Sequence, residues 1–183
     1  MNETIKIKLV FFLMLLISLL LLLKCQTDSS SNSEMFLKAK TDVEAGRYLV
    51  TIGGCNDCHT DRYLQKEGKI PEKDWLTGSK LGWRGPWGTT YASNLRLFVQ
   101  NVDEDDFVET IKTRKSMPPM PWMNVNKMSK KDARAIYKYL KFLGAKGDEM
   151  PRAVHPDKEP KTPYIWLVPA NSIPDNKVSK INN

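Results

Sequence analysis

The sequence predicts a single loop-rich domain whose regular elements are helices. Three segments, beginning near residues 42, 103 and 129, have apolar residues at helical spacing. The segment from Trp75 to Asn94 is rich in Gly, Trp and small polar residues, which indicates a loop layer and neither helix nor strand. About 149 of the 183 residues follow the apolar N-terminal run and its polar tether, which is enough for one domain with a core.

The composition excludes several classes of protein. No second apolar run approaches the length that spans a bilayer, which excludes a polytopic membrane protein. Three cysteines are too few for a small domain held together by disulfides. Eleven Pro and ten Gly indicate many loops, whereas five Trp, six Tyr and six Phe argue against disorder.

Residues 1–24 have the form of an export signal or N-terminal anchor. Lys6 and Lys8 precede the run LVFFLMLLISLLLLL at 9–23, which is shorter than the roughly 20 residues of a spanning helix. Cys25 stands where a bacterial lipoprotein carries its lipidated cysteine, and residues 25–35 form a polar tether. Lys24 replaces the small residue that such signals prefer, so an uncleaved anchor in which Cys25 has no role stays open. Both alternatives predict a membrane-anchored domain on the periplasmic or cell-surface side.

The run Cys55-Asn56-Asp57-Cys58-His59 is a C-x-x-C-H motif, the attachment pattern of a c-type haem. Two thiols on one helical turn can both add to the vinyl groups of one haem. The adjacent His59 can then ligate the iron as its proximal ligand. The sequence therefore predicts one covalent haem c held by Cys55 and Cys58. The export signal agrees with this prediction because c-type haems are attached after export.

Three other interpretations of the motif fit the sequence less well. A structural zinc site needs four ligands, and outside the leader the chain offers only Cys55, Cys58, His59 and His155. Adjacent Cys58 and His59 could hardly both ligate one zinc ion. A thioredoxin-type redox motif usually belongs to a βαβ unit, whereas a helix is predicted before this motif. A disulfide across two intervening residues would be strained.

The segment before the motif predicts a helix with Asp42 as its N-cap. Gly53 and Gly54 follow this helix, where the absence of side chains lets the backbone approach a flat macrocycle or another helix. The whole entrance, EAGRYLVTIGGCNDCHT, resembles the start of class I cytochrome c domains. Its apolar residues repeat at helical spacing, at Ala45, Leu49 and Ile52.

Residues 117–128, MPPMPWMNVNKM, resemble the Met-Pro-aromatic loop of cytochrome c domains in membrane-bound dehydrogenases. In that pattern the Met before Pro-aromatic ligates the haem iron, which here is Met120. The prolines stiffen an extended loop that could hold a thioether against iron. Met117, His155 and an open sixth position remain alternatives. We expect Met123 and Met128 to fill gaps in the core.

Two further helices are predicted. One starts near Asp103 and has acidic residues in its first turn. The other starts with a capping-box pattern at Ser129 and Asp132 and ends at Gly144. Its apolar stripe consists of Ala133, Ile136, Leu140 and Leu143.

Over residues 36–145 the chain is similar to monohaem class I c-type cytochromes, above all to haem domains in cytochrome subunits of membrane-bound dehydrogenases. The resemblance rests on CNDCH and MPW. It implies an all-α, cytochrome c-like fold of a few helices around one haem. It also implies electron transfer without enzyme activity of the chain's own. Alternatives are a dedicated electron-accepting subunit of a dehydrogenase or oxidase complex, and a haem sensor or peroxidase-like enzyme with an open sixth site. The residues that the resemblance places near the haem edge and propionates are Arg84, Trp87, Tyr91 and Asn94.

The net charge of +7 is unevenly distributed. Residues 103–109 are acidic, whereas residues 112–141 carry nine Lys or Arg against one Asp. A run of charge is often only a solvated face, but a basic rim near the haem would attract an acidic redox partner. Nucleic acid is not an expected partner, because the chain has an export signal and no recognisable binding motif.

The Pro-rich residues 146–183 predict an extended C-terminal tail. Its aromatic island at 164–168 should pack back on the domain, or else serve as a docking segment for a partner. The polar, loop-rich composition leaves little apolar material for a core. We therefore expect the domain to fold stably only with haem attached.

Overall fold

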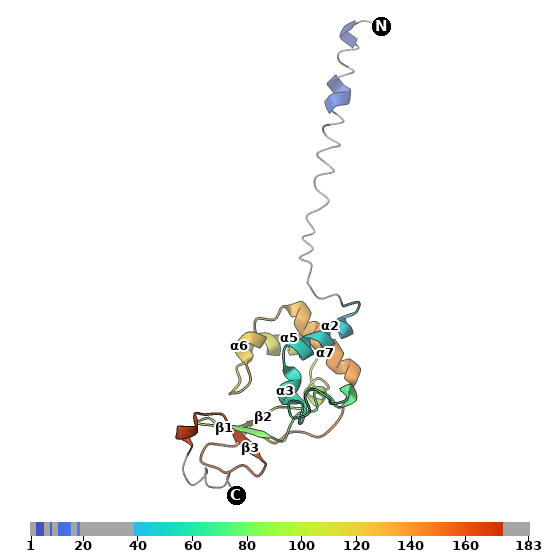
Figure 1. Cartoon of the computed structure of the whole chain (residues 1–183). Coiled ribbons are helices and arrows are strands. Elements are labelled where there is room, and N and C mark those ends of the chain that lie inside the picture. The colour runs from blue at the N-terminus through green and yellow to red at the C-terminus, as the bar shows by residue number, and fades with distance from the viewer. Residues whose placement is uncertain (1–2, 6–7, 9–10, 16–17, 19–38, 174–183) are drawn as a thin grey trace. The chain divides into compact units, whose positions relative to one another are not determined.

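Helix α7 (Lys130–Leu143) packs against both α2 (Asp42–Ile52) and α5 (Glu104–Thr113), as Figure 1 shows. The computed structural model describes residues 3–5, 8, 11–15, 18 and 39–173. All helices and strands discussed below belong to one unit of the chain, which begins at Ala39. Within the described residues, no helix combines the length and apolar character that crossing a membrane requires.

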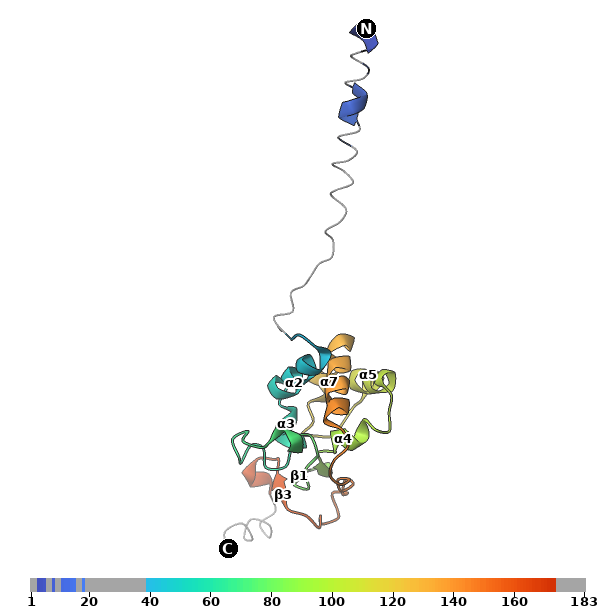
Figure 2. The same ribbon diagram turned by 90° about the vertical axis from the view of Figure 1, so that its right-hand side faces the viewer.

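Helices α2 and α7 lie side by side (Figure 2), and a glycine of α2 lies at their contact. A Cβ atom at Gly46 would lie 2.1 Å from the carbonyl oxygen of Ala135 and 2.7 Å from the Cβ of Tyr139. Only a residue without a side chain allows the two backbones to approach this closely. The crossing therefore depends on Gly46.

The helix ends follow the sequence signals with one exception. Thr41, and not the predicted Asp42, caps α2, because the Thr41 hydroxyl accepts a hydrogen bond from the Glu44 amide. Asp103 caps α5, and Ser129 opens α7 with the predicted capping box. Gly144 is the C-cap of α7, as expected.

The core lies where the three long helices meet the loop around Trp75. Met128 packs against this core as predicted, whereas Met123 is 61% exposed, so its expected core position is wrong. The buried residues of the core are Val50, Trp75, Leu76, Val99, Phe107, Ile136, Tyr139 and Leu140.

The prediction of an all-α, cytochrome c-like fold is wrong, because the structure also contains a mixed three-stranded sheet. Its strands are β1 (Gly82–Gly85), β2 (Gly88–Tyr91) and β3 (Tyr164–Trp166), in the order β2-β1-β3. β1 pairs antiparallel with β2 and parallel with β3. The segment expected to be a loop layer therefore forms a hairpin. Its strands of four residues are too short, and too rich in Gly, to show the alternation that predicts a strand.

Residues 154–167, called the strap below, pack along the hairpin. Val154 and Thr89 exchange two backbone hydrogen bonds of 2.8 Å, and the Leu167 amide donates to the Arg84 carbonyl at 2.8 Å. The Arg84 guanidinium lies 5.5 Å from the ring centroids of both Tyr164 and Trp166. The aromatic island thus packs back on the domain as predicted, although as a strand.

Short helices connect these parts. They are α3 (Cys55–His59), α4 (Leu95–Phe98), α6 (Trp122–Val125) and the 3₁₀ turns η1 (Glu72–Asp74) and η2 (Ala170–Ser172).

Candidate functional site

Helix α3 contains the whole C-x-x-C-H motif and starts after a left-handed turn. Gly54, its N-cap, has φ 65°, a conformation that favours glycine. The helix is one turn long and ends at His59, and the amide of its C-cap Thr60 donates to the Asn56 carbonyl at 3.0 Å. Cys55 and Cys58 are therefore one turn apart, and both are free thiols.

His59 is buried and oriented by a backbone group. Its Nδ1 lies 2.7 Å from the Ser93 carbonyl oxygen, and the residue is 8% exposed. Because a carbonyl oxygen only accepts hydrogen bonds, Nδ1 carries the proton and Nε2 keeps a free lone pair. Burial lowers the pKa of His59; the Ser93 contact opposes this shift, and the charge of Arg114 adds to it. A neutral imidazole with a free Nε2 is the form that ligates a metal.

The two thiols lie in different surroundings. Cys55 packs against the core, and burial raises its pKa to about 11. Burial, and to a lesser extent the charge of Asp57, also raises the pKa of Cys58. Both sulfurs are thus protonated at neutral pH, in contrast to the lowered thiol pKa that is typical of a redox C-x-x-C motif.

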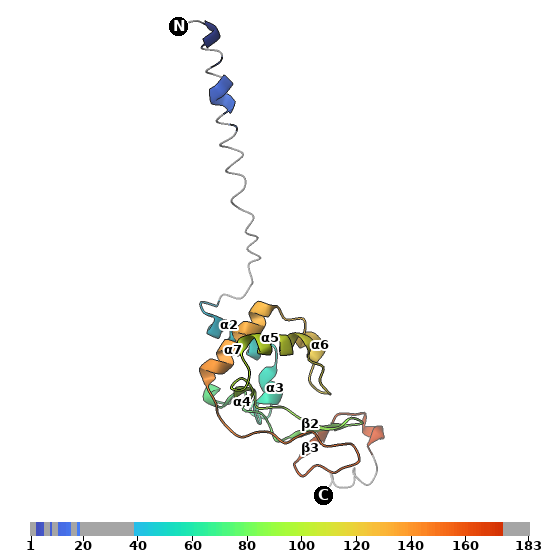
Figure 3. The ribbon, with the colours of Figure 1, turned by 180° about the vertical axis from the view of Figure 1, so that it is seen from behind.

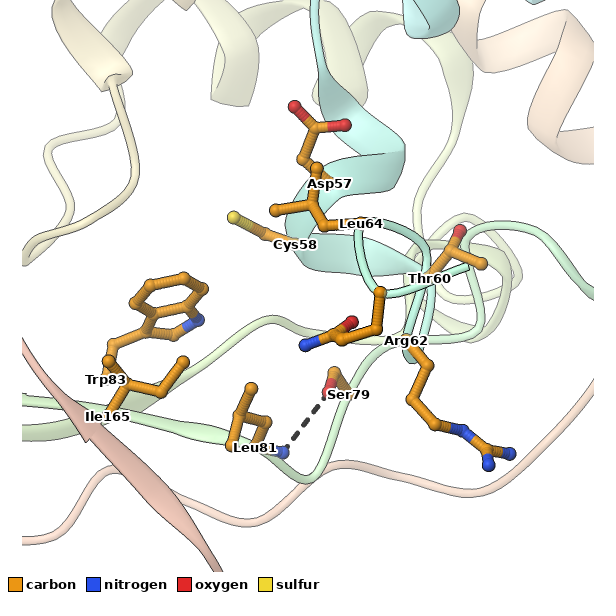
Figure 4. Close-up of a pocket in the computed structure, with 10 residues that line it drawn as sticks. Asp57, Cys58, Thr60, Arg62, Leu64, Ser79, Leu81, Trp83 and Ile165 are labelled. Atoms are coloured by element: carbon orange, nitrogen blue, oxygen red, sulfur yellow. Dashed lines mark hydrogen bonds between the residues drawn. The ribbon is translucent and has the colours of Figure 1, made fainter. Parts of the chain in front are cut away.

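An open hollow adjoins Cys58 (Figure 4). Trp83 of β1 and Ile165 of β3 are register partners, and both border this hollow. Neither residue was predicted from the sequence to belong to the site. Alternation along β1 would have placed Trp83 on the face opposite Arg84, but it required β1 to be recognised as a strand. The complete lining is Asp57, Cys58, Thr60, Arg62, Leu64, Gln65, Ser79, Leu81, Trp83 and Ile165.

The residues expected near the haem edge have other partners. Arg84 donates to the Thr89 hydroxyl at 2.8 Å and to the Pro156 carbonyl at 3.0 Å. The Tyr91 hydroxyl is hydrogen-bonded to Thr162, and Asn94 caps α4. These three side chains therefore hold the loops and the strap in place.

Trp87 lies in the turn of the β1–β2 hairpin. Its ring folds over Gly85, where a Cβ atom would lie 2.4 Å from the indole. The Trp87 Nε1 is buried without a hydrogen-bond partner among the described residues.

Met120 lies in the loop between α5 and α6 and is half-buried, whereas its rival Met117 is 46% exposed. This loop reaches toward the β1–β2 hairpin (Figure 3). The Thr90 hydroxyl donates to the Pro118 carbonyl at 2.6 Å. At the base of the loop, Lys112 Nζ donates to two backbone carbonyls, of Asn126 at 2.8 Å and of Met128 at 2.7 Å. The loop is therefore fixed at its tip and at its base.

Strand β2 and the residues after it contact the segments that carry both candidate axial ligands. Thr90 of β2 is hydrogen-bonded to the Met120 loop, and Ser93, three residues later, orients His59. An extended chain of this length places the Cα atoms of Thr90 and Ser93 at most about 11 Å apart. One short stretch of chain thus positions both ligand-bearing segments.

Other candidate residues lie elsewhere. Cys25 is outside the described residues. His155 is exposed in the strap, with its Nδ1 hydrogen-bonded to Asp157. Among the described residues, no three His, Cys, Asp or Glu side chains are grouped so that they could hold a metal ion. A haem needs a different donor set, and two free thiols beside a buried histidine with a free Nε2 fit it.

The chain matches no family model, no curated protein and no solved structure.

Proposed function

We propose that this protein is a membrane-tethered, extracytoplasmic electron carrier with one haem c. The proposal depends on the surroundings of His59. This residue is buried, its Nδ1 is hydrogen-bonded to the Ser93 carbonyl, and it follows two free thiols on the same helical turn. Cys55 and Cys58 would hold the macrocycle through thioether bonds, and His59 would ligate its iron. When bound, the haem supplies one-electron chemistry by cycling between ferric and ferrous iron.

Met120 is the proposed second axial ligand. It is more buried than Met117, and its loop is hydrogen-bonded to the same segment that orients His59. Thioether ligation raises the reduction potential relative to imidazole, and a fixed loop keeps the sulfur in place without a strong bond. The chain's own contribution is therefore to position two ligands and exclude water.

An acidic redox protein is the proposed partner. Within residues 112–141, Arg134 pairs with Glu104 and Asp105, and Lys138 pairs with Asp42. Five exposed cations without an ion pair among the described residues precede or follow the Met120 loop in the chain, and a sixth, Lys141, lies in the last turn of α7. The five are Arg114, Lys115, Lys127, Lys130 and Lys131. Unpaired positive charge around this loop would attract an acidic partner, and salt would weaken the attraction.

Membrane attachment is proposed from the sequence of the first 25 residues. Export would deliver the chain to the compartment where c-type haems are attached. Either a lipid on Cys25 or an uncleaved N-terminal segment would then keep the domain at the membrane.

The absorption spectrum of the exported protein tests the proposal. We expect a low-spin spectrum with the weak far-red band of sulfur-to-iron ligation in the oxidised form. Met120→Ala should abolish that band, and the matched variant Met117→Ala should retain it. Ready binding of carbon monoxide by the native protein would instead indicate a sensor or peroxidase-like site with an open position.

Co-purification distinguishes a free carrier from a dedicated subunit. The wild-type chain, extracted from its membrane in mild detergent, should exchange electrons with an acidic partner in a salt-dependent manner. Stable recovery in a complex with a dehydrogenase or oxidase subunit would make the chain a component of that complex.

A further inference from the structure

The strap borders the hollow beside Cys58, although it lies outside the region that resembles cytochromes. We propose that the strap forms one wall of the haem site and that Ile165 keeps water from the macrocycle near Cys58. This inference rests on the proposed function. It assigns residues 154–167 a part in setting the reduction potential.

The pairing of β3 with β1 places Ile165 beside the hollow. β3 runs parallel to β1, and Ile165 is the register partner of Trp83. Side chains of paired residues lie on the same face of a sheet, about 4.8 Å apart. Both side chains border the hollow that contains Cys58, as Figure 4 shows.

The strap is fixed from the face of the sheet opposite Ile165. Arg84 contacts the rings of Tyr164 and Trp166, the neighbours of Ile165 in the chain. Arg84 also donates to the Pro156 carbonyl, and Val154 is hydrogen-bonded to Thr89. These contacts hold the backbone of β3, and with it Ile165, beside the hollow.

The sheet side of the hollow is apolar. Ile165 is 41% exposed and Leu64, across the hollow, is 55% exposed. Leu81 and Trp83 also line the hollow, together with the polar residues Asp57, Thr60, Arg62, Gln65 and Ser79. The apolar side chains are suited to contact an apolar group and to exclude water on that side when it is bound. Ferric haem carries one more positive charge than ferrous haem, so a dry wall disfavours the ferric form. The apolar shell of a redox centre raises its potential in this way.

The experiment compares two variants of the full-length exported protein. Ile165→Asn introduces a polar group at the wall, and Leu167→Asn is its matched control. Leu167 is 40% exposed, lies one residue beyond the end of β3, and does not border the hollow. Redox titration of the absorption spectrum gives the midpoint potential of each protein.

We expect Ile165→Asn to lower the midpoint potential and Leu167→Asn to leave it at the wild-type value. Ile165→Val keeps a branched apolar side chain and should also retain the wild-type potential. Equal potentials for wild type and Ile165→Asn, with haem attached in both, would overturn the inference, as would equal shifts in the two Asn variants. Absence of covalent haem from the wild type would instead contradict the proposed function itself.

Discussion

The helical region and the sheet-and-strap region are built differently. Helices α2, α5 and α7 enclose a buried core, with Val50, Tyr139 and Leu140 fully inaccessible. The sheet has one face fixed by Arg84 and the other open toward Cys58. In the proposed function the two regions have different roles: the helices would form the packed frame, and the sheet would form one wall of the proposed haem site.

The largest expected effect follows from removing both thiols. The double variant Cys55→Ser, Cys58→Ser should lose all covalent haem, because no sulfur remains to form a thioether. It should also lose cooperative thermal unfolding, because the apolar side chains around the hollow would face only water. Circular dichroism and calorimetry measure the transition. A cooperative transition in this haem-free variant would show that the helical core folds without the cofactor.

The close contact of α2 with α7 at Gly46 tests the helical region. Gly46→Ala places a Cβ where only 2.1 Å separates it from the Ala135 oxygen, so the helices must move apart. We expect the free energy of unfolding to fall by about 1–3 kcal/mol in chemical denaturation. Tyr48→Ala, on the exposed side of the same helix, should change it by less than about 0.5 kcal/mol. If both variants changed the free energy of unfolding equally, the α2–α7 crossing would tolerate a side chain at position 46.

The strap is tested through Arg84. Arg84→Met removes the hydrogen bonds to Thr89 and Pro156 and the contacts with two aromatic rings, at a cost of about 1–3 kcal/mol. Hydrogen exchange should accelerate at the Val154 and Leu167 amides and stay unchanged in α7. The control Arg62→Met removes an exposed arginine and should leave these amides protected. Uniform acceleration across the domain would argue against two separable regions.

A smaller effect is expected at the base of the Met120 loop. Lys112→Met removes the ammonium that donates to the carbonyls of Asn126 and Met128. The haem should stay attached while the far-red band weakens. Lys127→Met, at an exposed position between α6 and α7 and with the same loss of charge, should keep the band. An unchanged band in both variants would show that Lys112 does not position the loop.

The smallest effect concerns the ion pair between Asp42 and Lys138. The hydrogen bond and charge of Lys138 lower the pKa of Asp42 below its ordinary value. A lowered carboxyl pKa stabilises the fold above the unfolded-state pKa of about 3.9, and this contribution is lost as pH falls. Asp42→Asn should therefore be slightly less stable than wild type at pH 7, with the gap closing below about pH 4. A difference in stability between the two proteins that does not change with pH would show that titration of the Asp42 carboxyl does not cause it.

The same comparison explains what could be predicted from the sequence. The long helices have local signals, such as the Ser129–Asp132 capping box and the apolar stripe that ends at Leu143, and these predictions were confirmed. Strand β3 depends on a contact between residues far apart in the chain, since Trp83 pairs with Ile165, and no local pattern predicts such a pairing. The local β1–β2 hairpin was missed because its strands are short and rich in Gly. The fold was therefore wrongly predicted as all-α.

The candidate site also contains residues that the sequence predicts and residues that it does not. The motif at Cys55, Cys58 and His59 is continuous and could be recognised from spacing alone. The Ser93 carbonyl that orients His59 is a backbone atom, so no residue type could have indicated it. Trp83 and Ile165 became candidates only when the sheet placed them beside Cys58.

The most direct test of the central claim is whether haem stays with the chain after unfolding. The full-length protein would be exported in a host that attaches c-type haems, denatured, digested and examined by absorbance and mass spectrometry. The account predicts one haem per chain, bonded to the peptide that contains Cys55 and Cys58. A chain without haem absorbance, in which Cys55 and Cys58 are recovered as free thiols or as a disulfide, would contradict the proposal.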